Sequence, residues 1–147
     1  MKKSDKAVEN FNNGYNCAQS VVAAYCDDLG LKTEDGLRVS EGFGGGMGRM
    51  RSVCGAVTGM FMLAGLKYSK GAKGDMDTRK LIYSKVQEMS KEFEEKAGSI
   101  ICAELLEGVM PENKDGTPTN GLLKKRPCSE YVRLAAEIAE KYLLAGE

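Results

Sequence analysis

One apolar segment, residues 52 to about 66, constrains the fold more than any other part of the chain. Its apolar residues fall on every side of a helical projection: Val57, Met60, Phe61, Leu63 and Ala64. A helix that is apolar on all sides is stable in water only when other elements surround it. We therefore predict that this segment forms the central and most buried helix of the protein.

The remaining apolar residues recur at steps of three and four, and no stretch shows the alternation typical of strands. Gly14 makes the first predicted helix an imperfect one, and the residues from Pro111 to Gly121 have the composition of a loop. The predicted helices cover residues 4–28, 33–39, 52–66 and 128–144, together with a long helix that Asp75 or Asp77 caps and that Gly98 ends, and a shorter helix that Ser99 caps and that Pro111 stops. The long helix carries one apolar stripe: Ile82, Val86, Met89, Phe93 and Ala97. We predict an all-α fold, a single-domain helical bundle of about five to six helices that spans residues 1–147.

A glycine-rich stretch from Gly42 to Gly48 precedes the central helix and is predicted to be a loop. Ser52 is the expected N-cap of that helix, which places Cys54 in its first turn. Unpaired backbone N–H groups and the helix dipole favour an anion at this position. The expected anion is the thiolate of Cys54, the form that binds metals and attacks disulfides.

Charge and hydropathy exclude several classes of partner. The chain has 21 Lys and Arg residues against 21 Asp and Glu residues, so it offers no net charge for nucleic acid or an anionic membrane. No apolar run approaches the roughly 18 residues that a bilayer crossing needs, and no export signal follows Met1. We expect a soluble cytoplasmic protein that binds neither nucleic acid nor membranes.

Histidine is absent, whereas cysteine occurs five times. The absence of histidine excludes Ser/His/Asp and Cys/His catalysis and removes the usual nitrogen ligand of metals. In a chain without an export signal, cysteines indicate thiols or metal thiolates rather than a disulfide framework. The five cysteines are Cys17, Cys26, Cys54, Cys102 and Cys128.

Cys54, Cys102 and Cys128 each fall at the start of a predicted helix, where a thiolate is stabilised. A single helical cysteine is often just a small buried apolar residue, but the repetition argues against that interpretation here. Cys17 and Cys26 are nine residues apart, about half a turn out of phase on a regular helix. Only one of those two can therefore face a given cluster.

These residues resemble a known family. Cys17, the motif Cys54-Gly55-Ala56-Val57-Thr58-Gly59, Cys102 and Cys128 are similar in order and spacing to the C_GCAxxG_C_C family of redox-active proteins. The resemblance implies a site made of Cys17, Cys54, Cys102 and Cys128 that binds an iron–sulfur cluster or cycles between thiol and disulfide. Cys26 has no counterpart in the family pattern and is expected in the core.

The residues around the motif suggest how such a site would be built. Gly55 and Gly59 lie four apart on one helix face and permit close approach of another backbone, while Arg49 and Arg51 add positive charge beside the cofactor. Four thiolates without nitrogen ligands suit an iron–sulfur cluster or a tetrahedral zinc ion. We expect iron–sulfur binding and electron transfer to a redox partner protein that the sequence does not identify.

Other functions remain open at this point. A metal-free thiol–disulfide oxidoreductase would use Cys54 as the attacking residue, resolved by Cys17, Cys102 or Cys128, so whether the protein is an enzyme is left open. A structural zinc site or a small-ligand module is a further alternative. The glycine run does not complete a G-x-G-x-x-G or Walker pattern, which argues against nucleotide binding. The apolar central helix suits an intramolecular bundle and a homo-oligomer equally.

Overall fold

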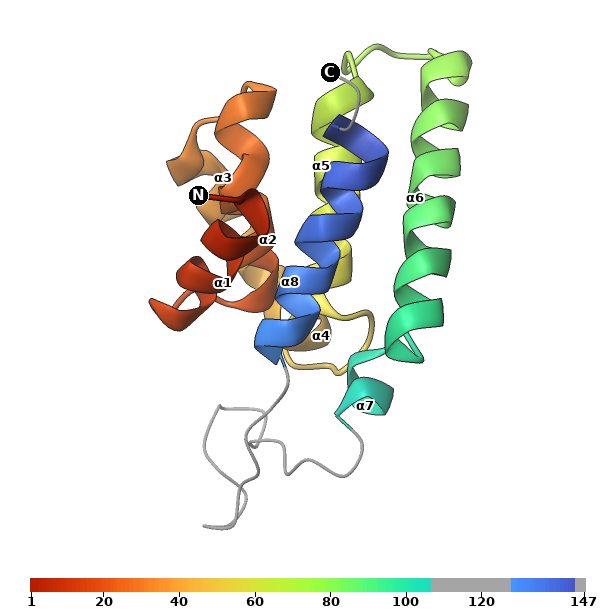
Figure 1. Ribbon diagram of the computed structural model, residues 1–147. Coiled ribbons are helices and arrows are strands. Elements are labelled where there is room, and N and C mark those ends of the chain that lie inside the picture. Colours follow the sequence, from red (N-terminus) through yellow and green to blue (C-terminus); the bar gives the residue numbers. More distant parts are fainter. Residues whose placement is uncertain (107–127, 145–147) are drawn as a thin grey trace, which may run out of the picture.

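The computed structural model describes residues 1–106 and 128–144, which are helical apart from short connections (Figure 1). Six helices of at least eight residues lie in these ranges: α1 (Lys3–Asn12), α2 (Cys17–Tyr25), α3 (Thr33–Ser40), α5 (Gly55–Tyr68), α6 (Met76–Ala97) and α8 (Cys128–Ala139). Shorter elements connect or extend them: η1 (Cys26–Leu29), η2 (Glu41–Phe43), α4 (Gly44–Met47), α7 (Cys102–Leu105) and the π-helical turn η3 (Glu140–Leu144). The all-α prediction is confirmed. The predicted loop at 111–121 lies outside the described residues.

Helix α5 is central, as predicted. It packs against α2, α6 and α8, and Figure 1 shows α6 on one side of it and α1, α2 and α3 on the other. The side chains of Val57, Met60, Leu63 and Ala64 are buried in the core. Neighbouring helices therefore cover most of the apolar surface of this helix, while Phe61, Met62 and Leu66 stay partly exposed. This burial is a main source of hydrophobic stabilisation.

Two glycines allow α5 to approach α2 closely. A Cβ atom at Gly55 would lie 2.8 Å from the Phe43 carbonyl oxygen and 3.2 Å from the Ala18 nitrogen. A Cβ atom at Gly59 would lie 3.0 Å from the Ala18 carbonyl oxygen. Both atoms would meet backbone, which cannot move aside as a side chain can. The prediction that these glycines serve close packing is confirmed.

The prediction of one helix over residues 4–28 is wrong in one respect, because two helices, α1 and α2, occupy this range. Gly14 has a φ of +109° and separates α1 from α2. Asn16 then caps α2 reciprocally: its side chain accepts a hydrogen bond from the Gln19 N–H, and the Gln19 side chain accepts one from the Asn16 N–H. As a result Cys17 is the first residue of a new helix rather than a residue in the middle of one.

Helix α6 begins and ends where its sequence indicates. The Asp75 side chain accepts a hydrogen bond from the Thr78 N–H at 3.2 Å, and Gly98, with a φ of +97°, ends the helix. Of the predicted apolar stripe, Met89 and Phe93 are fully buried. The outer members of that stripe are only partly buried: Ile82, Val86 and Ala97.

A buried carboxylate joins α6 to the end of the chain. Glu92 accepts hydrogen bonds from Lys141 at 2.7 Å, from the Tyr142 hydroxyl at 2.9 Å and from Lys96 at 3.1 Å. Its side chain is 11% exposed. The hydrogen bond from Lys141 is the largest of the effects that lower the pKa of Glu92 to about 2. This network fixes η3 against α6.

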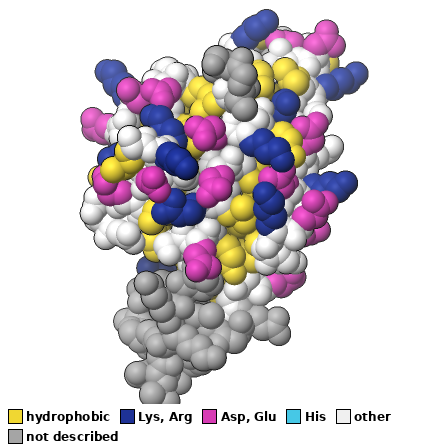
Figure 2. Space-filling view, in the orientation of Figure 1, with side chains coloured by type: hydrophobic (Ala, Val, Ile, Leu, Met, Phe, Trp, Pro, Cys, Tyr) yellow, Lys and Arg dark blue, Asp and Glu magenta, His cyan; other side chains and the backbone are white. Residues whose placement is uncertain are grey.

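Opposite charges alternate over the surface. On the face drawn in Figure 2, dark-blue Lys and Arg side chains lie among magenta Asp and Glu side chains, with no continuous patch of one sign. Arg133 of α8, for example, pairs with Asp5 of α1 at 2.6 Å. None of the described helices combines the length and the apolar character that crossing a membrane requires.

The close approach of α2 and α5 leads to a prediction on stability. Gly55→Ala is expected to lower the free energy of unfolding by about 1–3 kcal/mol, because the added methyl group meets backbone atoms. Gly65→Ala in the same helix is the matched control, since its Cβ would meet nothing within 4 Å. There, alanine should stabilise by about 0.5–1 kcal/mol. Urea unfolding of both variants measures the difference, and equal effects would contradict the packing role.

The Glu92 network leads to a prediction on pH. A carboxylate whose folded pKa is lowered stabilises the fold above its unfolded pKa of about 4.3, and this contribution is lost between about pH 4.3 and 2. Glu92→Gln should therefore reduce the free energy of unfolding by about 1–2 kcal/mol at pH 7, allowing for the exposure of its lysine partners. The difference from the unsubstituted protein should shrink towards pH 2. Unfolding measured from pH 7 to 2.5 tests this, and a constant difference would contradict it.

Candidate four-cysteine site

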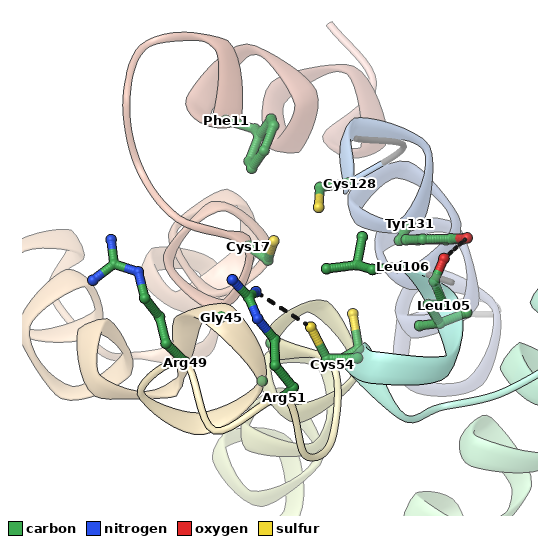
Figure 3. A pocket seen from close by; sticks show the side chains of 13 residues that line it. Phe11, Cys17, Gly45, Arg49, Arg51, Cys54, Leu105, Leu106, Cys128 and Tyr131 are labelled. Atoms are coloured by element: carbon green, nitrogen blue, oxygen red, sulfur yellow. Dashed lines mark hydrogen bonds between the residues drawn. The ribbon is translucent and has the colours of Figure 1, made fainter. Parts of the chain in front are cut away.

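Four cysteines line one cavity of about 100 Å³ at the end of the bundle where α4 and α7 lie (Figures 1 and 3). Each comes from a different part of the chain and from a helix start: Cys17 begins α2, Cys54 is the N-cap of α5, Cys102 begins α7 and Cys128 begins α8. The sequence predicted three such positions. The break at Gly14 adds the fourth, so all four thiols enter the cavity from helix starts.

Backbone pairing holds Cys54 and Cys102 side by side. The Cys54 N–H donates to the Ile100 carbonyl at 2.8 Å, and the Cys102 N–H donates to the Ser52 carbonyl at 2.6 Å. Between them, Val53 and Ile101 form an isolated antiparallel bridge. These bonds keep residues 52 and 53 extended, which is why α5 begins after Cys54. The prediction that Ser52 caps this helix is therefore wrong.

The predicted cap of the next helix, Ser99, also has a different role. Ile101 is the N-cap of α7. The Ser99 hydroxyl accepts a hydrogen bond from the Ile101 N–H at 2.9 Å and donates to the Glu104 carboxylate at 2.6 Å. These two hydrogen bonds stabilise the turn before Cys102, although Ser99 is not the N-cap of α7.

Cys17 and Cys128 meet on the other side of the cavity. A hydrogen bond between their thiols is the largest of the effects that hold the pKa of Cys17 well above its usual range, and burial adds to it. Gly55 permits this placement, because a Cβ there would lie 3.3 Å from the Cys17 Cβ. Tyr131, one helical turn after Cys128, donates its hydroxyl to the Leu105 carbonyl at 3.3 Å. That bond connects the end of α7 to the first turn of α8.

The glycine run forms a left-handed turn rather than an irregular loop. All five residues from Gly45 to Arg49 have positive φ angles, and the Gly48 N–H donates to the Gly44 carbonyl at 2.9 Å. Left-handed backbone is accessible to glycine but costs other residues about 1–2 kcal/mol each. Gly46 also has no room for a side chain, since its Cβ would lie 2.6 Å from the Cys102 Cβ. This turn forms the wall of the cavity beside Cys102.

Within residues 1–106 and 128–144, Arg51 is one of three residues other than glycine with a positive φ, here 60°. Its backbone is held on both sides: its N–H donates to the Gly45 carbonyl at 3.3 Å, and its carbonyl accepts from the Ala103 N–H at 3.1 Å. Its side chain enters the cavity, and Nη1 donates to the Cys102 Sγ at 3.7 Å (Figure 3). Of the two arginines predicted to face a cofactor, Arg51 contacts a cysteine sulfur.

Burial, rather than the helix start, dominates the protonation of Cys54. It raises the pKa of the Cys54 thiol to about 11, against the opposing effect of the Val57 and Ala56 backbone N–H groups. The prediction of a stabilised thiolate at this position is therefore wrong for the metal-free protein. Without a bound metal ion, the raised pKa favours the protonated thiol of Cys54 at neutral pH, and a protonated thiol is a poor nucleophile.

The cavity suits soft ligand chemistry, although the thiols do not surround a single point. Its described lining holds four thiols, no carboxylate and no imidazole. In residues 1–106 and 128–144, no group of three Cys, Asp, Glu or His side chains is arranged as one metal ion would need. The four sulfur atoms line a common space without converging as the ligands of one ion do.

The remaining predicted residues lie as follows. Cys26 is fully buried away from the cavity, where a Cβ at Gly36 would lie 2.6 Å from its sulfur, so its predicted place in the core is confirmed. Gly55 lines the cavity, whereas Gly59 packs against Val21 of α2. Arg49 borders the cavity with an exposed side chain.

Several lining residues were not singled out from the sequence. Tyr131 could have been found, because it lies three residues after Cys128 and shares its helix face. Phe11 had no such signal, since it reaches the cavity only because the chain turns between α1 and α2. The apolar members of this group are Phe11, Leu105, Leu106 and Tyr131.

Comparison with known proteins places the chain among relatives whose names carry little functional detail. A protein of Archaeoglobus fulgidus described only as uncharacterized is 29% identical over an alignment that covers 94% of this chain and 93% of its own length. No solved structure matches the chain significantly.

A family model matches residues 15–142, a range that contains all four cysteines of the cavity. Its description is "Putative redox-active protein (C_GCAxxG_C_C)". The break before Cys17, the glycine contacts at Gly55 and the shared cavity give this pattern of distant cysteines a common location. The chain belongs to the C_GCAxxG_C_C family, which is described as redox-active.

Proposed function

We propose that Cys17, Cys54, Cys102 and Cys128 bind an iron–sulfur cluster and that the protein transfers electrons. The observation that carries the proposal is that four thiols from four separate helix starts line one cavity without carboxylate or imidazole neighbours. Thiolates are the usual ligands of such clusters, and one-electron transfer is the chemistry that a bound cluster supplies. The family's redox description supports the same choice.

The donor set and the family's redox description favour a cluster over zinc. A zinc ion in a structural site draws four ligands around one point, with Zn–S bonds of about 2.3 Å. A cluster instead separates its thiolates, because they bind more than one iron atom. The described thiols line a shared cavity but form no group of three that suits one ion. Four thiols without carboxylate or imidazole neighbours suit a cluster, and the family's redox description favours it over a redox-inactive zinc ion.

The protein's own residues would support electron transfer in three ways. The backbone pairing of residues 51–54 with residues 100–103 holds Cys54 and Cys102 in place, so little reorganisation accompanies a change of charge. Phe11, Leu105 and Leu106 limit the access of water to the cavity. Arg51 donates a hydrogen bond to the Cys102 sulfur, and its positive charge compensates the negative charge of bound thiolates.

One observation favours a second candidate, a thiol–disulfide oxidoreductase. The thiols of Cys17 and Cys128 are hydrogen-bonded to each other, so they are neighbours that could be oxidised to a disulfide. This pair differs from the predicted one, in which Cys54 attacks and Cys17, Cys102 or Cys128 resolves the mixed disulfide. The pKa values of Cys54 and Cys17 are both raised, which lowers the thiolate fraction of either residue. Such an enzyme would be active without metal. Formation of one disulfide bond would remove two titratable thiols.

Anaerobic purification with iron, zinc and sulfide analysis distinguishes these functions. We expect a coloured protein that contains iron and acid-labile sulfide, either as purified or after reconstitution. A colourless protein without iron or sulfide after both treatments would overturn the proposal. Zinc in a 1:1 ratio would identify a structural zinc site, and metal-free loss of two thiols on mild oxidation would support the disulfide enzyme.

Single serine substitutions assign the ligands. Changing Cys17, Cys54, Cys102 or Cys128 to Ser is expected to reduce iron per chain at least several-fold, because a hydroxyl is a much poorer ligand for iron than a thiolate. Cys26→Ser is the matched control, since Cys26 lies outside the cavity and its thiol faces the Lys32 carbonyl at 3.9 Å. It should bind as much iron as the unsubstituted protein. Equal iron loss in Cys26→Ser would show that the loss reflects general damage to the fold.

The left-handed turn gives an independent test of the same site. Gly46→Ala is expected to lower iron loading, because the methyl group would collide with the Cys102 Cβ and with the backbone of residues 51 and 52. Gly48→Ala imposes the same backbone strain at a φ of +65°, but its Cβ would meet nothing closer than 3.7 Å. Iron content and thermal unfolding measured for both variants separate the collision from the strain. Equal loading would contradict a cavity wall at Gly46.

A further inference from the structure

We propose that Arg51, and not its neighbour Arg49, raises the reduction potential of the four-cysteine site through its N–H···S hydrogen bond to Cys102. The inference rests on the proposed function, because it concerns a cluster bound by these cysteines. It separates two arginines that the sequence alone treats as equivalent, since both precede Cys54 and both border the cavity.

The contact itself is the first argument. Nη1 of Arg51 lies 3.7 Å from the Cys102 Sγ, and the Arg51 side chain is partly buried at the cavity. Figure 3 shows its guanidinium group directed towards the cysteines. Reduction adds one electron and makes the site one unit more negative. A hydrogen-bond donor with a positive charge next to a ligand sulfur stabilises that extra charge, so the potential rises.

The backbone around Arg51 is the second argument. Arg51 has a φ of 60°, a conformation that a glycine would adopt without strain. Hydrogen bonds to Gly45 and Ala103 hold it there from both sides. Strain of this kind persists where the surrounding structure enforces it, and it is found preferentially at functional sites. Here the strained backbone aims the side chain at Cys102.

Arg49 provides the contrast. Its φ of 64° is nearly the same, but its side chain is exposed, and Figure 3 shows its guanidinium directed away from the four cysteines. A Cβ at Gly45 would lie 2.8 Å from the Arg49 Cγ, so the stem of this side chain packs on the turn and only its guanidinium points away. Water and salt screen the charge of an exposed arginine. Its effect on the potential is therefore smaller.

Arg51→Gly and Arg49→Gly form a matched pair that tests the proposal. Each removes one positive charge at a position of positive φ, where glycine relieves backbone strain. The measurement is the midpoint potential of the cluster-loaded protein, titrated anaerobically with dithionite as the one-electron donor. We expect a clearly lower potential for Arg51→Gly and a much smaller shift for Arg49→Gly. Thermal unfolding of the cluster-free variants should change little.

Arg51→Lys tests the contribution of charge. Lysine retains the positive charge and a donor, so it should restore part of the potential that Arg51→Gly loses. If Arg51→Gly binds no cluster, the potential of Arg51→Lys decides: a shift larger than that of Arg49→Gly supports the proposal, and an equal or smaller shift overturns it. Loss of the cluster in both variants points to packing alone and overturns it.

The remaining outcomes separate this inference from the proposed function. Equal shifts for the Arg51 and Arg49 variants, or no shift in either, overturn the role of Arg51 while the cluster itself stands. An unsubstituted protein that binds no cluster refutes the proposed function and with it the inference.

Discussion

The site depends on a short piece of backbone pairing between residues 51–54 and residues 100–103. Three N–H groups, those of Cys54, Cys102 and Ala103, donate to carbonyls across this pair at 2.6–3.1 Å. Because the bonds join main chain to main chain, they place Cys54 and Cys102 together whatever side chains surround them. Because of this pairing, α5 begins only after Cys54, which lines the cavity. The pairing also holds the backbone of Arg51, whose side chain faces Cys102.

Glycines set the remaining distances by having no side chain. Gly55 lets α2 lie against α5, which brings Cys17 to the cavity, and Gly46 lets the left-handed turn lie against Cys102. In both cases a methyl group would meet atoms closer than 3.0 Å. The central helix thus has two structural roles: its apolar residues hold the bundle together, and its first glycine lets α2 approach with Cys17.

Much of this arrangement could be predicted from local sequence patterns, and the errors have a common physical cause. The helical periodicities, the burial of α5 and the separate location of Cys26 follow from residue spacing. The cap of α5 could not be predicted, because Ser52 pairs with Cys102, which lies 50 residues further along the chain. The raised pKa of Cys54 likewise reflects burial by distant elements rather than its helix start. Local patterns identify the helices, whereas contacts between distant segments decide what happens at their ends.

The order of the four cysteines along the chain has a consequence for how the protein is made. Cys17 lies in the second helix, whereas Cys128 begins the last long helix, and α8 also packs against α1. A chain emerging from the ribosome therefore holds three of the four thiols before the residues that close the cavity have been synthesised. A site that needs all four thiols is completed only after residues 128–144 have folded back onto the first helix. Insertion of the proposed cofactor would then follow the synthesis of residues 128–144, and a bound cofactor would join segments that lie far apart in the chain, as a covalent cross-link does.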